Sequence, residues 1–314
     1  MYKILSIDGG GIKGVFPASF LATIEEAVGG NIGQYFDLIV GTSTGGIIAL
    51  GLASGMSSKD VLRFYEESGP EIFKGNRVLR FVRQIGVAKY SQKPLKDALT
   101  ACFGDKLLGE CKTRVVIPSL NLETGEVYVY KTAHHDRFKR DFKERLVDVA
   151  LATSAAPTYF PTMRSAAGTP LVDGGLWANN PVGTAVVEAI GVLGWKQGEF
   201  EVLSIGCTTD PLSIKWGRVL PLGMGYWAKK SVEAFMKAQS SQSLGTAQLL
   251  GGHGHIYRYD PVLPHKRFSL DGTNEITSLK GLGSSKAREA LPTLERVFFE
   301  SEAAPFQPCH HLAV

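Results

Sequence analysis

Phe36-Asp37-Leu38-Ile39-Val40-Gly41-Thr42-Ser43-Thr44-Gly45-Gly46-Ile47-Ile48-Ala49-Leu50 is the stretch of the chain that decides the fold. The largely apolar run over residues 36–40 predicts a buried strand, and the small and apolar residues over 44–53 predict a helix. The strand therefore turns into the helix at Ser43, between Gly41 and Gly45. A serine on such a sharp turn is held exposed, and small neighbours let the backbone turn, so Ser43 is a candidate nucleophile.

The pattern Gly-x-Ser-x-Gly is weak evidence when it stands alone. A chain of 314 residues with 36 glycines gives such matches by chance. The alternative is a glycine-rich cap that only begins a helix. The rest of the chain must therefore decide whether Ser43 does chemistry.

A second glycine-rich turn lies upstream, at Asp8-Gly9-Gly10-Gly11-Ile12-Lys13-Gly14, between a predicted strand at 3–7 and a predicted helix at 16–28. Its spacing fits a dinucleotide fingerprint, which also needs an acidic residue at the end of the second strand. Ser43 follows that strand instead, so an NAD(P)-dependent oxidoreductase is disfavoured. Consecutive glycines can also point backbone N–H groups into one concavity, as an oxyanion hole requires. Gly9, Gly10 and Gly11 are therefore candidate oxyanion donors, with a simple tight turn as the alternative.

A serine nucleophile needs a base, and none of the seven histidines lies in a distinctive segment. Asp173 is the better candidate, because it follows the short apolar strand Leu171-Val172 and precedes Gly174 and Gly175. A carboxylate at the C-terminal end of a strand can reach the sheet edge that carries Ser43. Partial burial would raise its basicity enough to accept a proton. The alternative is an ordinary aspartate in a turn.

Four ordered blocks together resemble the patatin-like phospholipase family over about the first 210 residues: Asp8–Gly14, Gly41–Gly45, Ala152–Phe160 and Asp173–Gly175. The resemblance implies a three-layer α/β/α fold with a mostly parallel central sheet. It also implies that Ser43 is the nucleophile, that Asp173 is its dyad partner, and that Gly9, Gly10 and Gly11 form the oxyanion hole. Members of the family hydrolyse lipid acyl esters with neither a catalytic histidine nor a metal or other cofactor.

A finer resemblance concerns the run Tyr35–Leu52, which is similar to bacterial patatin-like effectors of anti-phage (CBASS) systems. It implies that a cyclic di- or trinucleotide from a partner synthase activates the enzyme, which then degrades the host's own membrane phospholipids. The C-terminal part offers cations that lipase chemistry does not require: Lys229, Lys230, Arg258 and Lys266. A constitutive housekeeping or storage-type lipid acyl hydrolase is the alternative. A non-enzymatic lipid-binding module would need a broken dyad, and both dyad residues are present.

The segment Lys74–Lys96 carries seven Lys or Arg and no acid, interleaved with apolar residues. Such a composition suits the surface of an anionic bilayer. We therefore expect a membrane-facing lid, with Arg77, Arg80 and Arg83 as the membrane-facing candidates. A solvated loop over the core is the alternative.

Composition is that of an ordinary globular protein, with 44% hydrophobic and 20% charged residues and a formal net charge of +4. The four cysteines form no disulfide framework, and no leader is recognised, so we expect a reduced, cytoplasmic protein that acts at the inner face of the membrane. Alternating strands and helices predict one α/β domain over 1–314, with a helical C-terminal part at 211–314 that could be regulatory and a loose tail. We also expect a homo-oligomer, and no DNA or RNA partner.

Overall fold

The two predicted strand–helix units form the centre of the protein. The structure, a computed structural model, describes residues 1–74, 87–211, 223–263 and 267–312. In the first unit, β1 (Tyr2–Ile7) leads through a 3-10 turn (Gly11–Gly14) into α1 (Val15–Val28). In the second, β2 (Leu38–Gly41) leads through Ser43 into α2 (Thr44–Ala53), whose bounds are those predicted. Because β1 and β2 are parallel neighbours, both turns lie at the same edge of the sheet.

The sheet extends from this pair in both directions, in the order β5-β6-β3-β2-β1-β7-β8, with β4 also paired to β3. The strands β3, β2, β1, β7 and β8 run parallel, while β4, β5 and β6 are antiparallel additions at one side. This confirms the mostly parallel sheet. The remaining strands are β3 (Arg114–Asn121), β4 (Val127–Lys131), β5 (Met163–Arg164), β6 (Pro170–Asp173), β7 (Phe200–Ile205) and β8 (Ile256–Tyr259).

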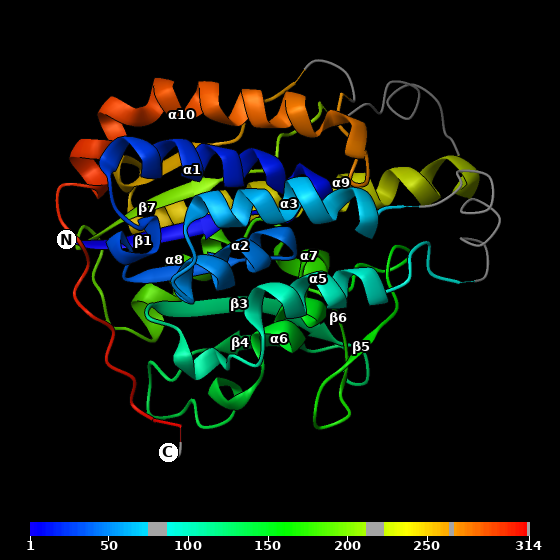
Figure 1. Cartoon of the computed structure of the whole chain (residues 1–314), viewed down its shortest axis with the longest axis horizontal. Helices are drawn as coiled ribbons and strands as arrows, with labels where there is room; N and C mark the ends of the chain where they lie inside the picture. The colour runs from blue at the N-terminus through cyan, green and yellow to red at the C-terminus, as the bar shows by residue number, and fades with distance from the viewer. Residues whose placement is uncertain (75–86, 212–222, 264–266, 313–314) are drawn as a thin grey trace.

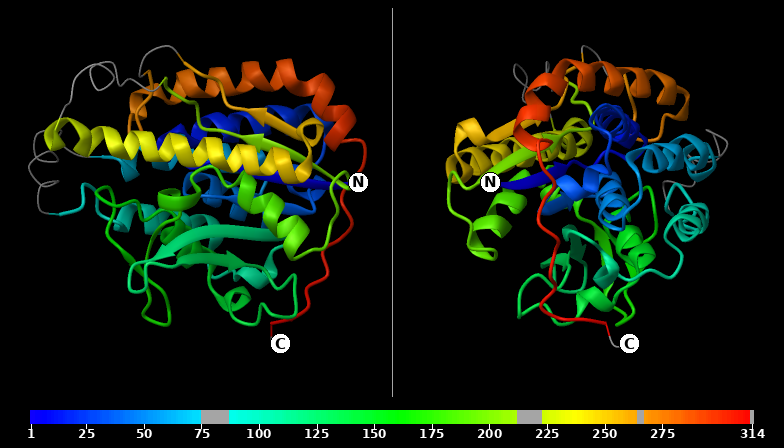
Figure 2. Two further views of the ribbon diagram at one scale, coloured as in Figure 1. Left: turned by 180° about the vertical axis from the view of Figure 1, so that it is seen from behind. Right: turned by 60° about the vertical axis from the view of Figure 1, so that its left-hand side comes forward.

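Helices cover both faces of the sheet, as Figures 1 and 2 show. Successive strand residues point to opposite faces, so Leu5 joins the core on one side of β1 and Ile4 the core on the other. One face carries α1, α2, α3 (Ser58–Ile72), α5 (Lys93–Phe103), α6 (Leu146–Thr153) and α10 (Ile276–Phe298). The other carries α8 (Val182–Gly191) and α9 (Met224–Gly251). The three-layer α/β/α fold is therefore confirmed.

The C-terminal part packs on both outer layers of this fold. α10 lies along α1, where the Ser19 hydroxyl donates to the carbonyl of Lys280 at 2.8 Å. α9 lies along α8, and its first turns extend past the body at the end of the molecule opposite the N-terminus (Figures 1 and 2). The prediction of a loose tail is wrong for its described residues, because the N–H of Cys309 donates to the carbonyl of Ala133 at 2.7 Å.

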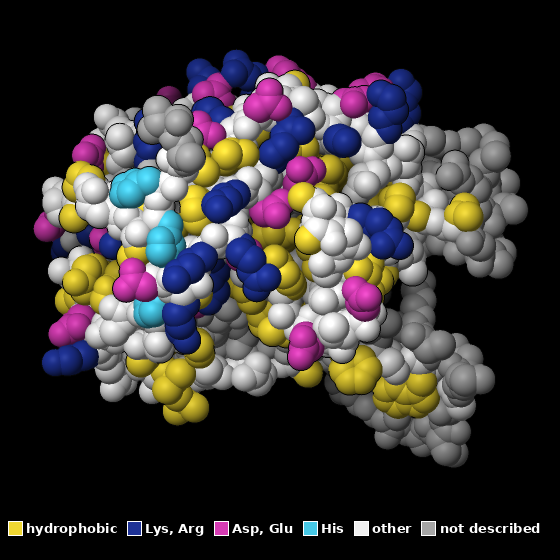
Figure 3. All heavy atoms as spheres, turned by 90° about the horizontal axis from the view of Figure 1, so that it is seen from below, with side chains coloured by type: hydrophobic (Ala, Val, Ile, Leu, Met, Phe, Trp, Pro, Cys, Tyr) yellow, Lys and Arg dark blue, Asp and Glu magenta, His cyan; other side chains and the backbone are white. Residues whose placement is uncertain are grey.

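The face of the molecule drawn in Figure 3 mixes charged and apolar side chains. Among the described residues, no helix combines the length and the apolar character that crossing a bilayer requires. The predicted membrane-facing residues Arg77, Arg80 and Arg83 lie outside the described residues.

Candidate active site

Ser43 stands on a strained turn between β2 and α2. Its φ of 55° and ψ of −122° fall in a region that residues with a Cβ rarely adopt. The turn is tight because Gly45 packs on the end of β1, where a Cβ would lie 2.6 Å from the carbonyl oxygen of Asp8. Gly41 likewise leaves no room for a side chain against the backbone of Gly45. These contacts give the predicted flanking glycines a physical reason.

Thr153, at the end of α6, holds the backbone of Ser43, the candidate nucleophile. The N–H of Ser43 donates to Thr153 Oγ1 at 2.9 Å, and the Thr153 hydroxyl donates to the carbonyl of Pro118 at 2.6 Å. Thr153 belongs to the third sequence block, but nothing in the sequence shows that this threonine supports Ser43.

Asp173 lies beside Ser43 and is almost fully buried. Its Oδ1 accepts the N–H of Gly175 at 2.7 Å. Burial raises the pKa of Asp173 to about 6, although hydrogen bonds from the Ser43 side chain and from Gly175 act in the opposite direction. A carboxylate with this pKa is ionised at neutral pH and basic enough to take a proton from a serine.

The strand β6, which carries Asp173, runs antiparallel to β2. β6 is antiparallel to β3, and Asp173 pairs with Ser119. The two catalytic candidates still meet, because β3 extends past its pairing with β2, which ends at Val116 and Val40. The overhanging part of β3 carries β6 to the level of the Ser43 turn.

The histidines of the described part take no role at Ser43. The imidazole of His134 pairs with Glu188 at 2.9 Å, and that of His255 pairs with Glu201 at 2.9 Å. Burial lowers the pKa of His134. In the same residues no cluster of three or more His, Cys, Asp or Glu side chains is placed to hold a metal ion.

The first glycine loop lies against Ser43. Of its three predicted oxyanion donors, Gly9 is already engaged in another hydrogen bond. The N–H of Gly9 donates to the carbonyl of Asn179 at 2.9 Å, so it is not free to bind an oxyanion. Within the described part of the chain, the N–H groups of Gly10 and Gly11 donate to no protein group. A Cβ on Gly9 would lie 3.3 Å from the Ser43 Cβ, which places the loop beside Ser43. The candidate oxyanion donors therefore reduce to Gly10 and Gly11.

Substituting Gly10 tests this assignment. A Cβ at this position would collide with the Cys207 side chain, whose Sγ would be 2.8 Å away, so Gly10→Ala must displace the loop. We expect kcat for ester hydrolysis to fall by about 10²-fold, the typical cost of losing one oxyanion donor. Gly191→Ala is the matched control, because a Cβ there meets nothing within 4 Å. Equal turnover by both variants in a steady-state assay would refute the role of Gly10.

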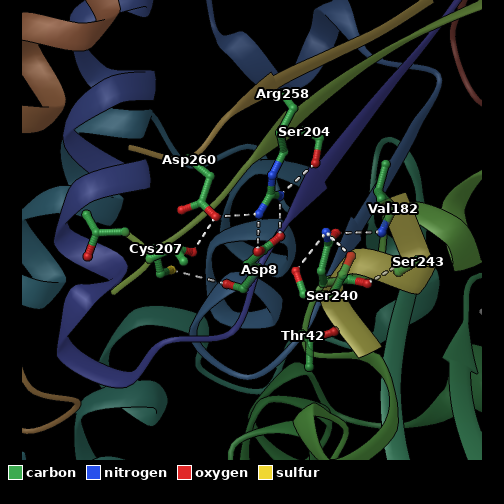
Figure 4. A network of polar contacts seen from close by, with 12 residues as sticks. Asp8, Thr42, Val182, Ser204, Cys207, Ser240, Ser243, Arg258 and Asp260 are labelled. Carbon is green, nitrogen blue, oxygen red and sulfur yellow. Dashed lines mark hydrogen bonds and ion pairs between the residues drawn. The ribbon is translucent and has the colours of Figure 1, made fainter. Parts of the chain in front are cut away.

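Three successive carbonyls, beginning with that of the last residue of α7 (Gly175–Ala178), bind the Ser43 turn, the glycine loop and α9. The carbonyl of Ala178 accepts the Thr42 hydroxyl at 2.6 Å, and that of Asn179 accepts Gly9. The carbonyl of Asn180 accepts the hydroxyl of Ser243, on α9, at 2.6 Å (Figure 4). The helix α8 begins at Val182 with Pro181 as its cap, and Asn180 Oδ1 accepts the N–H of Val182 at 3.1 Å.

Comparison with known proteins decides the family. The family model described as patatin-like phospholipase matches residues 5–186. The chain belongs to the patatin-like phospholipase family. This confirms the predicted family and the predicted class of enzyme, a serine esterase acting on lipid esters.

Patatin-like relatives of two kinds resemble the chain. A Pseudomonas aeruginosa protein named cGAMP-activated phospholipase is 35% identical over 302 residues, which cover 92% of this chain and 89% of that protein. A protein of the same name from Vibrio cholerae is 33% identical over 341 residues, covering 97% and 96%. Patatin-like protein 2 of Oryza sativa subsp. indica is 31% identical over 250 residues, covering 67% and 62%. The bacterial matches therefore include the C-terminal part of the chain, which lies beyond the family model.

Proposed function

We propose that this protein hydrolyses acyl esters of membrane phospholipids with the Ser43–Asp173 dyad, and that a cyclic oligonucleotide from a partner synthase activates it. The observation that carries the hydrolysis is the strained, accessible serine in contact with a buried carboxylate whose pKa is about 6. Ser43 attacks the acyl carbonyl while Asp173 takes its proton, and the N–H groups of Gly10 and Gly11 stabilise the oxyanion. Water then cleaves the acyl-serine. No metal or other cofactor takes part in these steps.

A small apolar cavity lies beside α2, the helix that follows Ser43. Ile47 lies one helical turn after Ser43, and its N–H donates to the Ser43 carbonyl at 3.1 Å. The cavity lies between α2, α3 and α5, and Ile47 is one of the residues that line it. Its volume of about 10 Å³ is room for about one water molecule, so it does not hold an acyl chain in this conformation. The residues that line the cavity are Ile47, Gly51, Met56, Val61, Phe64, Leu99, Cys102 and Phe103.

The names of the bacterial relatives support activation by a cyclic dinucleotide. The predicted cations of the C-terminal part support it less than expected. Arg258 is engaged in buried ion pairs, and Lys230 pairs with Glu233 at 3.2 Å. Lys266 and the side chain of Lys229 are outside the described part of the structure.

Product analysis on mixed phospholipid vesicles tests both halves of the proposal. We expect free fatty acid from the purified protein only when one member of a panel of cyclic di- and trinucleotides is added. The Ser43→Ala variant with the same nucleotide is the control and should release none. Full activity without nucleotide would favour the constitutive hydrolase, and no activity with any nucleotide or lipid would count against the proposal.

We further propose that the enzyme acts as a homo-oligomer, in the cytoplasm at the inner face of the membrane. The basic segment 74–96 would make the membrane contact, because each cation near an anionic surface contributes about 1 kcal/mol. Charge reversal at Arg77, Arg80 and Arg83 should reduce sedimentation with anionic vesicles and leave hydrolysis of a soluble ester unchanged. Unchanged sedimentation would support the solvated-loop alternative.

The proposed oligomeric state is measured separately, by gel filtration with light scattering.

A further inference from the structure

A buried ion pair joins the C-terminal part of the chain to the glycine loop. The guanidinium of Arg258, on β8, meets the carboxylate of Asp8 at two points, with Nη1–Oδ1 at 2.7 Å and Nη2–Oδ2 at 2.6 Å (Figure 4). It also donates to Ser204 Oγ at 2.9 Å and to Asp260 Oδ2 at 3.0 Å. The Arg258 and Asp8 side chains are only 15% and 6% exposed. A fork with two parallel contacts fixes the orientation of both groups, not only their separation.

The pair acts on the backbone that carries the oxyanion donors, because Asp8 directly precedes Gly9, Gly10 and Gly11. The thiol of Cys207 donates to the carbonyl of Asp8 at 3.4 Å, and its side chain lies under Gly10. Held at both its side chain and its carbonyl, Asp8 has little freedom to rotate. The direction in which the following N–H groups point therefore depends on the Arg258 fork.

The ion pair between Arg258 and Asp8 also balances charge near the glycine loop, where the negative oxyanion would form. Unpaired carboxylates at Asp8 and Asp260 would oppose an oxyanion on the glycine loop. Burial raises the pKa of Asp8 to about 6, and Arg258 acts against this rise and favours the ionised form. Arg258, with Lys13, whose Nζ donates to the carbonyl of Thr208 at 2.9 Å, supplies two positive charges against the two carboxylates.

Arg258 lies outside residues 5–186, the part of the chain that the family model matches. We propose that Arg258 is a positioning residue for the reaction, which holds the Gly10 and Gly11 N–H groups toward the oxyanion through its bidentate pairing with Asp8. This inference rests on the proposed ester hydrolysis. Through Arg258, the C-terminal part of the chain would influence the geometry of the active site.

Three variants separate positioning from simple stabilisation: Arg258→Met, Arg258→Lys and the double variant Asp8→Asn/Arg258→Met. Arg258→Met leaves a buried carboxylate without its partner, so both the melting temperature and kcat should fall. The double variant removes both charges of the fork but leaves Asp260 without its arginine, so its melting temperature should recover only in part. Its kcat on a soluble p-nitrophenyl ester should nevertheless stay at least about tenfold low at similar KM, since the fork is absent. Arg258→Lys keeps the charge without the fork and should fall between the double variant and the native protein.

The matched control is the pair Lys131–Glu188, which is buried to a similar degree, at 17% and 5% exposure, and joins β4 to α8. Lys131→Met should lower the melting temperature and leave kcat unchanged. Native kcat in the double variant, or in a folded Arg258→Lys variant, would overturn the positioning role. A native protein that is inactive with every cyclic nucleotide of the panel, and that also fails to react with a fluorophosphonate probe at Ser43, would instead overturn the proposed hydrolysis.

Discussion

Replacing Ser43 by glycine is expected to abolish ester hydrolysis and to leave the fold at least as stable as before. The hydroxyl is the proposed nucleophile, and removal of a catalytic serine lowers kcat by roughly 10⁴-fold or more. The backbone at this position has a φ of 55°, which strains a residue with a Cβ by about 1–3 kcal/mol. Glycine adopts such a conformation without that cost. The free energy of unfolding in urea should therefore stay equal or rise while activity disappears.

Ser43→Ala is the control that separates the two effects. It removes the hydroxyl but keeps the Cβ, so the activity should be lost to the same extent without a gain in stability. A variant that keeps more than about 1% of the native kcat would exclude Ser43 as the nucleophile. A glycine variant less stable than the alanine variant would show that the strain is not located at this turn.

The local elements of the fold could be predicted because their signals lie in contiguous residues. The bounds of α2 at 44–53 were correct, since a run of small and apolar residues marks this helix. The strands β5 and β8 were missed. β8 consists of Ile256-Tyr257-Arg258-Tyr259, a short run interrupted by a cation, and only pairing with β7 makes it a strand.

The residues of the candidate site could be predicted from the sequence, but the strand direction and the contacts that bring them together could not. Ser43 and Asp173 were recognised by their position after strands, next to glycines. The direction of β6 has no local signature, because strand direction is set by pairing with residues about 50 positions away, such as Ser119 with Asp173. The same is true of the contact between Asp8 and Arg258, which are separated by 250 residues. An arginine with no visible partner looked available for an anion, and the fold shows that it is already paired.

Asp173→Asn is expected to reduce kcat by about 10³-fold, within the range that a general base contributes. The amide oxygen can still accept the N–H of Gly175, so the local structure should persist, but it cannot take the serine proton. In the native protein the carboxylate must be ionised to act. Because the pKa of Asp173 is about 6, kcat/KM should rise about tenfold per pH unit up to pH 6 and then level off. The residual kcat/KM of the Asp173→Asn variant should not show this rise with pH.

The same substitution should increase stability at neutral pH. The pKa of Asp173 is raised from 3.8 to about 6 in the folded protein, so between these values the folded state holds a proton that the unfolded chain has lost. The stability that this group contributes is therefore complete below about pH 3.8 and is lost as the pH rises through 6. Asparagine does not ionise. Above pH 6 the free energy of unfolding of the variant should therefore exceed that of the native protein, by about 1.4 kcal/mol for each unit of the pKa shift. Asp8 titrates near the same pH, but it is present in both proteins and its contribution cancels in the difference. Urea unfolding at pH 5 and pH 8 measures the gain; a variant that loses stability at pH 8 would show that the carboxylate is not a strained base but a favourable structural contact.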